Sequence, residues 1–331
     1  MLRKVIGVDF GTTKTVVVGW DGTILYNEPS IVAINTISNK VIEIGNEAQK
    51  TVGKTPENIS IAYPIKEGVV SSPRVAAAVL SYLIAKILKR NKLFKPDLIL
   101  SIPVGITSVE KRAMYEAGIT AGAREVYLVP SLLCAAKGVN MDVSSPFGNT
   151  ILSIGGGITE LGIMSLNGLV ISDSVRIAGN NLTESIIGYI KKHLQLLVGY
   201  SMADMVKTSV GSAIKENKQI EIEVRGRDAT SNMPKNIIIK TNDIVDPIKP
   251  QITSIITMIK HVMEKTPPEL SSDLVDAGIM ICGGTGNLPN LSTVLTKSIG
   301  VSFYTAEDPE LSVAKGLQKI ISQPEVYTIY K

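Results

Sequence analysis

Residues 5–15 read Val-Ile-Gly-Val-Asp-Phe-Gly-Thr-Thr-Lys-Thr, and the interpretation of the whole chain begins with them. The apolar run at 5–8 has the composition of a buried strand, and a second apolar run, 16–18, follows almost at once. The pattern predicts a β-hairpin whose tip carries glycine, hydroxyl groups and an ammonium group. Backbone N–H groups, hydroxyls and lysine at a tight turn are groups that bind phosphate. Asp9, at the strand end, is suited to hold a hydrated Mg²⁺ ion.

The hairpin pattern occurs a second time, which favours phosphate binding over an ordinary Gly-Thr turn. Residues 150–159 read Thr-Ile-Leu-Ser-Ile-Gly-Gly-Gly-Ile-Thr, and an apolar strand and an Asn-Gly turn follow. When the two copies are aligned, Ser153 falls on Asp9. A third glycine turn, Cys-Gly-Gly-Thr-Gly at 282–286, follows a late apolar run. Two hairpins that hold phosphates from opposite sides, with a glycine turn near a nucleoside, predict a nucleotide cleft between two related halves.

Length and composition indicate a globular protein with two domains or one bilobal unit. The chain has 331 residues, of which 44% are hydrophobic and 19% charged. The net charge of +4 comes from scattered lysines and arginines, so no nucleic-acid partner is expected. Neither a signal peptide nor an apolar run long enough to span a membrane is expected. Cys134 and Cys282 lack metal-site spacing and are expected to be buried, reduced thiols.

Strand and helix patterns alternate along both halves, which predicts an α/β fold with mixed sheets. Thr107 and Glu110 have the spacing of a capping box at the start of a helix. The tail at 326–330 alternates like an edge strand, and a frayed end fits it equally well. The expected helices are 46–52, 73–93, 107–122, one that begins near Ser131, 182–194, 202–209, 247–264, 288–299 and 309–321.

The order of these motifs resembles the actin/Hsp70/sugar-kinase superfamily. Along the chain the motifs are the first hairpin, residues 64–69, residues 102–107, the second hairpin, Ala178-Gly179 and the late glycine turn. Finer stretches are similar to the MreB family of bacterial actins, and the resemblance covers essentially the whole chain. These stretches are 27–34, 121–127, 188–190 and 224–228.

The resemblance implies an actin-like fold of two lobes, each with an inserted subdomain, and a nucleotide cleft between them. A protein of this kind binds ATP or ADP with Mg²⁺ and polymerises into filaments, commonly as paired protofilaments. The implied divisions are 1–34, 65–145 and 310–331 for the first lobe core (IA), 35–64 for its insertion (IB), 146–179 and 246–309 for the second lobe core (IIA), and 180–245 for its insertion (IIB).

The resemblance also assigns roles to individual residues. Asp9 would hold Mg²⁺ through water. Asp204 and Lys207 occupy positions that contact ribose and adenine, although Asp204 replaces a glutamate of the family. The implied nucleotide contacts are Gly11, Thr12, Thr13 and Lys14 in the first phosphate loop, Gly155, Gly156 and Gly157 in the second, and Gly283, Gly284 and Thr285 behind the adenosine.

The chain departs from the family at the positions that support hydrolysis. Ser153 stands where the family has an aspartate of the metal and water network, and Ile158 where it has a threonine. Ser131 stands where the family has the glutamate that positions the attacking water, and no carboxylate occurs in 129–134. A neutral hydroxyl cannot accept the proton of that water near neutral pH, and loss of a general base commonly lowers a rate by about two to four decades. Weak ATP hydrolysis is therefore predicted.

Other functions compete with a weakly hydrolysing filament protein. The first is a fully active filament ATPase with relocated catalytic groups, for which Glu160 and Glu125 are the nearby carboxylates. A sugar or acetate kinase of the same superfamily is less favoured, because no inserted motif with a substrate-binding aspartate is evident. A chaperone-like ATPase is not expected, since it would need a substrate domain beyond residue 331.

An apolar pair among cations predicts contact with a membrane surface. Leu93 and Phe94 lie among four basic residues, Lys89, Arg90, Lys92 and Lys95. The arrangement resembles the membrane-insertion loop of the MreB family and suits an anionic leaflet, where each basic residue contributes up to about 1 kcal/mol. A helix end whose Leu and Phe pack into the core is the alternative. The expected location is cytoplasmic and peripheral at the inner membrane, with other copies, actin-like paralogues and anionic lipid as partners.

Overall fold

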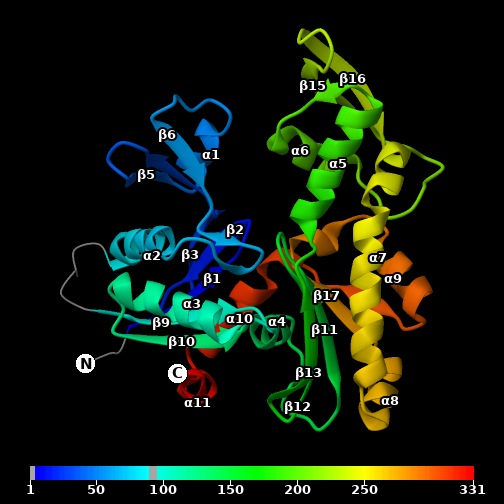
Figure 1. Cartoon of the computed structure of the whole chain (residues 1–331). Helices are drawn as coiled ribbons and strands as arrows, with labels where there is room; N and C mark the ends of the chain where they lie inside the picture. Colours follow the sequence, from blue (N-terminus) through cyan, green and yellow to red (C-terminus); the bar gives the residue numbers. More distant parts are fainter. Residues whose placement is uncertain (1–3, 89–94) are drawn as a thin grey trace.

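The computed structural model describes residues 4–88 and 95–331 and has two lobes side by side (Figure 1). A five-stranded sheet in the order β3-β2-β1-β9-β10 forms the first lobe. Its central strand β1 pairs antiparallel with β2 and parallel with β9. The strands are β1 Val5–Phe10, β2 Lys14–Val18, β3 Ile24–Pro29, β9 Asp97–Ile102 and β10 Glu125–Pro130.

The second lobe repeats this topology, with a sheet in the order β13-β12-β11-β17-β18. Here β11 pairs antiparallel with β12 and parallel with β17. The repeated hairpin in the sequence therefore corresponds to a repeated sheet, which confirms the prediction of two related α/β halves. The strands are β11 Asn149–Ile154, β12 Thr159–Ser165, β13 Gly168–Val175, β17 Ile279–Cys282 and β18 Phe303–Thr305.

Helices cover both faces of the first sheet, because successive side chains of its buried strands point to opposite sides. Ile6 and Val8 pack with α2 (Pro73–Leu88) and α3 (Ser108–Thr120). Val5 and its neighbours on the other face pack with α4 (Ser131–Gly138) and α10 (Ser312–Ile320). The same cluster includes Ile151 and Met164 of the second sheet, so α4 and α10 lie between the two lobes.

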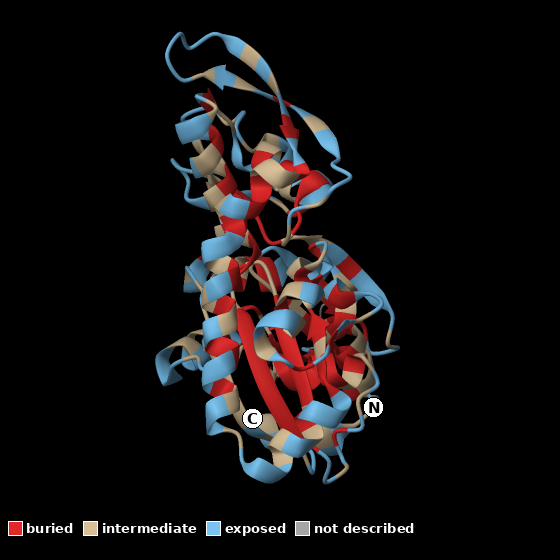
Figure 2. Cartoon of the chain, turned by 90° about the vertical axis from the view of Figure 1, so that its right-hand side faces the viewer, coloured by how far each residue is buried: buried red, intermediate tan, exposed pale blue. Residues whose placement is uncertain are grey.

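The second sheet is buried on the face that α7 (Thr241–Lys265) covers, and α5 (Gly179–His193) and α9 (Leu291–Ile299) join the same core. Figure 2 shows the strands of this sheet as a buried layer and α7 with one buried stripe. This pattern is the 3.6-residue periodicity of an amphipathic helix at the surface of a core.

Besides a two-stranded sheet of β7 (Ile65–Lys66) and β8 (Val69–Val70), two three-stranded sheets extend from the lobes (Figure 1). The first contains β5-β4-β6 with helix α1, and the second contains β14-β15-β16 beside α5 and α6. Their elements are β4 Val32–Asn35, β5 Lys40–Ile44, β6 Ile59–Ala62, α1 Asn46–Thr51, α6 Tyr200–Val210, β14 Leu196–Leu197, β15 Glu221–Asp228 and β16 Pro234–Lys240.

Several expected elements differ from the structure. The chain end forms a short helix, α11 (Pro324–Tyr327), and neither a strand nor a frayed end, because Tyr327 is buried with its ring 4.9 Å from that of Tyr127. Helix α7 begins at Thr241, six residues before Pro247, since its first turns continue the buried apolar stripe. The expected last helix is a 3₁₀ turn, η2 (Pro309–Leu311), followed by α10.

The expected helix 288–299 begins only at Leu291 in α9, and α8 (Pro268–Ala277) was not expected. The capping box and the two cysteines agree with expectation. Thr107 and Glu110 form the predicted capping box at α3. Cys134 and Cys282 are buried free thiols. In the ranges 4–88 and 95–331, no helix combines the length and the apolarity needed to cross a membrane.

Candidate functional site

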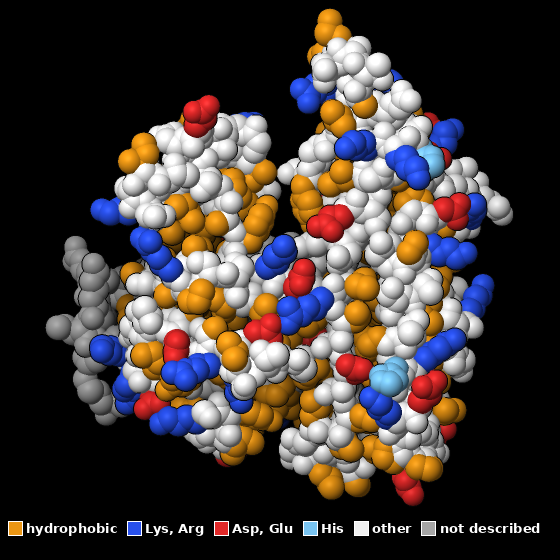
Figure 3. Space-filling view, viewed as in Figure 1, with side chains coloured by type: hydrophobic (Ala, Val, Ile, Leu, Met, Phe, Trp, Pro, Cys, Tyr) orange, Lys and Arg blue, Asp and Glu red, His pale blue; other side chains and the backbone are white. Residues whose placement is uncertain are grey.

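A cavity of about 430 Å³ lies between the lobes, and Figure 3 shows the molecule hollowed between its two upper parts. The turn after β1 lines it from the first lobe and the turn after β11 from the second. The site residues predicted from the sequence, apart from the membrane pair, all line this cavity: Asp9, Gly11, Thr12, Thr13, Lys14, Ser131, Ser153, Gly155, Gly156, Gly157, Ile158, Glu160, Asp204, Lys207, Gly283, Gly284 and Thr285. Leu93 and Phe94 lie outside the described residues.

The two glycine turns have the same local geometry. In the first, the Gly11 N–H donates to the Lys14 carbonyl at 3.1 Å, and in the second the Gly155 N–H donates to the Ile158 carbonyl at 3.0 Å. The turns also touch, because a Cβ atom on Gly156 would overlap the Thr13 hydroxyl. Only glycine permits this close approach, so the turns form one continuous lining of backbone and hydroxyl groups suited to an anion.

Asp9 lies at the base of the cavity and is the candidate metal ligand. The Ser101 hydroxyl donates to its carboxylate at 2.8 Å. Burial raises the pKa of Asp9 to about 6, and the hydrogen bond from Ser101 opposes this rise. Among the described residues no three His, Cys, Asp or Glu side chains could hold a metal by themselves. A lone carboxylate fits Mg²⁺, which binds one or two carboxylates together with waters and substrate phosphates.

A carboxylate reaches Ser131 from the neighbouring lobe. The Ser131 hydroxyl lies 2.9 Å from both carboxylate oxygens of Glu160, and the Val104 N–H donates to one of them at 2.7 Å. Burial raises the pKa of Glu160 to about 7, and the charge of Asp9 adds to the rise. Glu160 is 3% exposed and pairs directly with Ser153 in the strand register.

The other nearby carboxylate, Glu125, does not approach the cavity. It begins β10, whose opposite end leads into Ser131, and it forms an ion pair with Lys331 at 2.9 Å. The expectation that Glu125 could substitute for the missing catalytic carboxylate is therefore wrong, because it lies at the other end of its strand.

The far side of the cavity carries a polar network. Lys207 donates to Asp204 at 2.6 Å, to Thr183 at 2.8 Å and to the Gly179 carbonyl at 3.1 Å. The Thr285 hydroxyl donates to the Gly155 carbonyl at 2.7 Å and so joins the third glycine turn to the second. A carboxylate beside a cavity accepts hydrogen bonds from vicinal hydroxyls such as those of a ribose.

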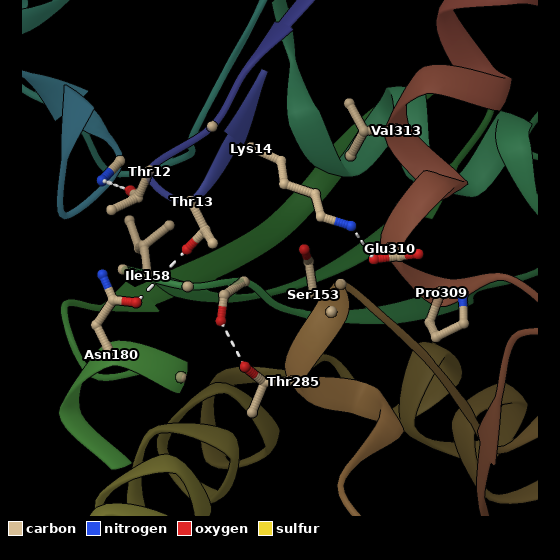
Figure 4. Close-up of a pocket in the computed structure, with 18 of the residues that line it drawn as sticks. Thr12, Thr13, Lys14, Ser153, Ile158, Asn180, Thr285, Pro309, Glu310 and Val313 are labelled. Atoms are coloured by element: carbon tan, nitrogen blue, oxygen red, sulfur yellow. Dashed lines mark hydrogen bonds and ion pairs between the residues drawn. The ribbon is translucent and has the colours of Figure 1, made fainter. Parts of the chain in front are cut away.

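Sequence reasoning missed five polar residues of the cavity: Ser101, Asn180, Thr208, Asn287 and Glu310. Ser101 lies in β9, and no sequence pattern indicated that this strand pairs with β1 and brings Ser101 to Asp9. Asn180 accepts a hydrogen bond from Tyr200 at 2.8 Å. It accepts a second from Thr13 at 3.5 Å (Figure 4). No sequence pattern could identify Glu310 as a cavity residue, because its partner Lys14 lies 296 residues away in the chain.

Comparison with known proteins shows likeness over nearly the whole chain. The family described as MreB/Mbl protein matches residues 3–328. The cell shape-determining protein Mbl of Bacillus subtilis is 35% identical over 316 residues, covering 96% of this chain and 95% of that protein. The cell shape-determining protein MreB of Escherichia coli is 34% identical over 333 residues, covering 99% and 96%.

A solved structure agrees with these relatives. The crystal structure of MreB5 of Spiroplasma citri bound to ADP superposes with a TM-score of 0.93 and 29% identity, covering 99% of this chain and 98% of that one. The likeness confirms the predicted actin-like fold of two lobes.

Proposed function

The chain belongs to the MreB/Mbl protein family, and from this premise we propose that it is an ATP-binding bacterial actin that polymerises into cytoskeletal filaments. The observation that carries the proposal is the meeting of two glycine turns of matching geometry, one from each lobe, across a single cavity. Relatives named for determining cell shape support a role in shape or motility. The ADP bound to MreB5 of Spiroplasma citri supports nucleotide binding at the corresponding cleft.

In this proposal the phosphate chain lies between the two glycine turns and receives backbone N–H groups from both. Asp9 holds Mg²⁺ through water, which supplies positive charge beside the phosphates. Asp204 accepts the ribose hydroxyls, and the turn that contains Gly283 and Gly284 supports the nucleoside. Burial raises the pKa of Asp9 to about 6, so below that pH its carboxyl would have to lose a proton before it could hold a metal ion.

We further propose that hydrolysis is weak. The first hairpin has Asp9 where the second has Ser153, so the two equivalent hairpin positions supply one carboxylate where a symmetric pair would supply two. Ser131 supplies a hydroxyl where the family has a carboxylate, and Ile158 supplies no hydroxyl at all. The attacking water therefore lacks the base that the family provides.

A second candidate function, a fully active filament ATPase, has one observation in its favour. Glu160 lies within hydrogen-bond distance of Ser131, and its pKa of about 7 is close to that of an efficient general base at neutral pH. However, Glu160 is nearly fully buried and already accepts hydrogen bonds from Ser131 and Val104, which leaves little of it to face a water molecule. We therefore keep the weak ATPase as the main proposal.

Replacing Asp9 with alanine should lower ATP affinity at least about tenfold when Mg²⁺ is present, since the carboxylate that holds the metal is lost. Calorimetry measures the affinity, and electron microscopy of the same samples should show filaments for the wild type with ATP and Mg²⁺. Asp276→Ala is the control, because Asp276 is an exposed residue of α8 (Pro268–Ala277) outside the cavity. Absence of Mg²⁺-dependent binding at millimolar ATP, or equal affinity in Asp9→Ala, contradicts the proposal.

We also propose that the filaments lie on the inner face of the cell membrane. The support is the sequence around Leu93 and Phe94, which combines an apolar pair with four basic residues. Pairing with actin-like paralogues is part of the same proposal and rests on the resemblance to the MreB family alone.

The double substitution Leu93→Ser/Phe94→Ser should remove most binding to vesicles that contain anionic lipid, because the apolar anchor is lost. Co-sedimentation at low and high salt measures this, and wild-type binding should fall as salt screens the basic residues. Ile37→Ser removes an exposed apolar side chain elsewhere and should leave pelleting unchanged. Equal pelleting of wild type and double variant at low salt would exclude this segment as the anchor.

A further inference from the structure

We propose that Glu310 discriminates nucleotides by the charge of their phosphate chain. Its carboxylate contacts the Lys14 ammonium, and phosphates that bind in the cavity must compete with it for that cation. Glu310 therefore weakens binding in proportion to phosphate charge and speeds nucleotide release. This inference rests on the proposed function, ATP binding at the same cavity.

The geometry of the pair is that of a direct contact inside the cavity. The Lys14 ammonium lies 2.6 Å from a Glu310 carboxylate oxygen, and both residues line the cavity. Figure 4 shows the two side chains pointing toward one another beside Ser153 and Pro309. Both side chains remain about half exposed, at 45% and 43%. Exposed ion pairs are weak, so a polyanion competes effectively for the ammonium.

The cavity offers few other cations to the phosphates. Among the described residues that line it, Lys14 and Lys207 are the cationic side chains. Lys207 already donates to Asp204, Thr183 and a backbone carbonyl on the nucleoside side. Lys14 is carried by the first phosphate turn and is therefore the cation placed to meet phosphate oxygens. The Glu310 carboxylate beside Lys14 offsets the charge of its ammonium group, and the same carboxylate repels the phosphate chain.

Glu310 is held in place by the backbone around it. It lies in η2, and the Gly283 N–H donates to the Pro309 carbonyl at 2.7 Å, which ties η2 to the third glycine turn. The chain then enters α10, which packs on the first lobe. The backbone that carries Glu310 therefore stays at the cavity when phosphates bind, and its carboxylate remains near enough to repel them.

The experiment compares the affinities of wild type and Glu310→Gln for adenosine, ADP and ATP at fixed Mg²⁺ and salt. Glu310→Gln should tighten ATP binding by about three- to tenfold, a modest factor because solvent screens the exposed groups. The affinity for ADP should increase less, and the affinity for adenosine should not change, because the repulsion between Glu310 and the ligand grows with the phosphate charge. Stopped-flow measurement should show slower ADP release from the variant.

Asp308→Asn is the matched control. Asp308 lies two residues from Glu310 and pairs with Lys315 at 2.5 Å, but it does not line the cavity. Its neutralisation should leave all three affinities unchanged. Equal or weaker ATP binding by Glu310→Gln, or equal tightening for adenosine and ATP, overturns the inference while the wild type still binds ATP. Failure of wild type and variant to bind any nucleotide overturns the proposed function itself.

Discussion

Replacing Ser131 with glutamate should raise the rate of phosphate release by about two decades, because it restores a carboxylate at the position where the family places one. Loss of water activation adds roughly 3 to 5 kcal/mol to a barrier, at about 1.36 kcal/mol per decade. ATP affinity should stay within a few fold, since the phosphate contacts come from backbone groups that the substitution leaves in place. A phosphate-release assay under single-turnover conditions measures the change.

The surroundings of Ser131 determine how the new carboxylate behaves. Its side chain would approach Glu160, whose oxygens lie 2.9 Å from the present hydroxyl. Two carboxylates in one buried site share a proton, so the pKa of one rises and the other remains available as a base. Adding Ser153→Asp should increase the rate further, because Ser153 occupies the place of Asp9 in the second hairpin.

Ser131→Ala is the control and should leave the slow rate nearly unchanged, since it adds no base. Phosphate release by the wild type as fast as in an ordinary bacterial actin contradicts the weak-ATPase proposal. In that event Glu160→Gln identifies the group responsible. A loss of about two decades in that variant would assign the base to Glu160 and establish the second candidate function.

Replacing Gly316 with alanine should destabilise the fold by about 3 kcal/mol or more, since it inserts an atom where two helix backbones touch. Gly316 lies on α10, and a Cβ atom there would overlap the Cys134 carbonyl of α4. Gly138 on α4 meets the Ser312 carbonyl in the same way. Both partners are backbone atoms of helices buried between the sheets, so neither can move aside without displacing its helix.

Thermal or denaturant unfolding of Gly316→Ala measures this loss. Gly188→Ala is the matched control, because Gly188 lies on the exposed side of α5 with no atom within 4 Å of an added Cβ. It should raise stability by about 0.5 to 1 kcal/mol through helix propensity. An equal effect of the two substitutions, or a stable Gly316→Ala protein, would show that the helix crossing tolerates a wider spacing.

The sequence by itself determined the α/β class and the two phosphate turns, because these signals are local, whereas cavity residues such as Asp204 and Lys207 were assigned only through the resemblance to the MreB family. A buried strand followed by a glycine turn and a second strand specifies a hairpin within about fifteen residues. The second copy at 150–159 then specified the pseudo-symmetry, and the glycines of both turns specified where backbone groups would meet an anion. Each of these features depends on neighbours in the chain, so one sequence sufficed to predict them.

Tertiary packing decided the elements whose local pattern is ambiguous. The tail at 326–330 has alternating residues, yet Tyr327 is buried against Tyr127, and the segment is helical. Helix α7 extends before its prolines because Ile244 and Val245 are buried there. In both places the area buried against distant residues outweighs a weak local preference.

The chemistry of the cleft was decided only by the tertiary structure. Ser131 meets Glu160, Asp9 meets Ser101 and Lys14 meets Glu310 across sequence separations of 29, 92 and 296 residues. Strand register and the packing of α10 bring these pairs together, and no periodicity in the chain reports them. The polar pairs that set the charge and protonation of groups in this cavity can therefore be identified only from the tertiary structure.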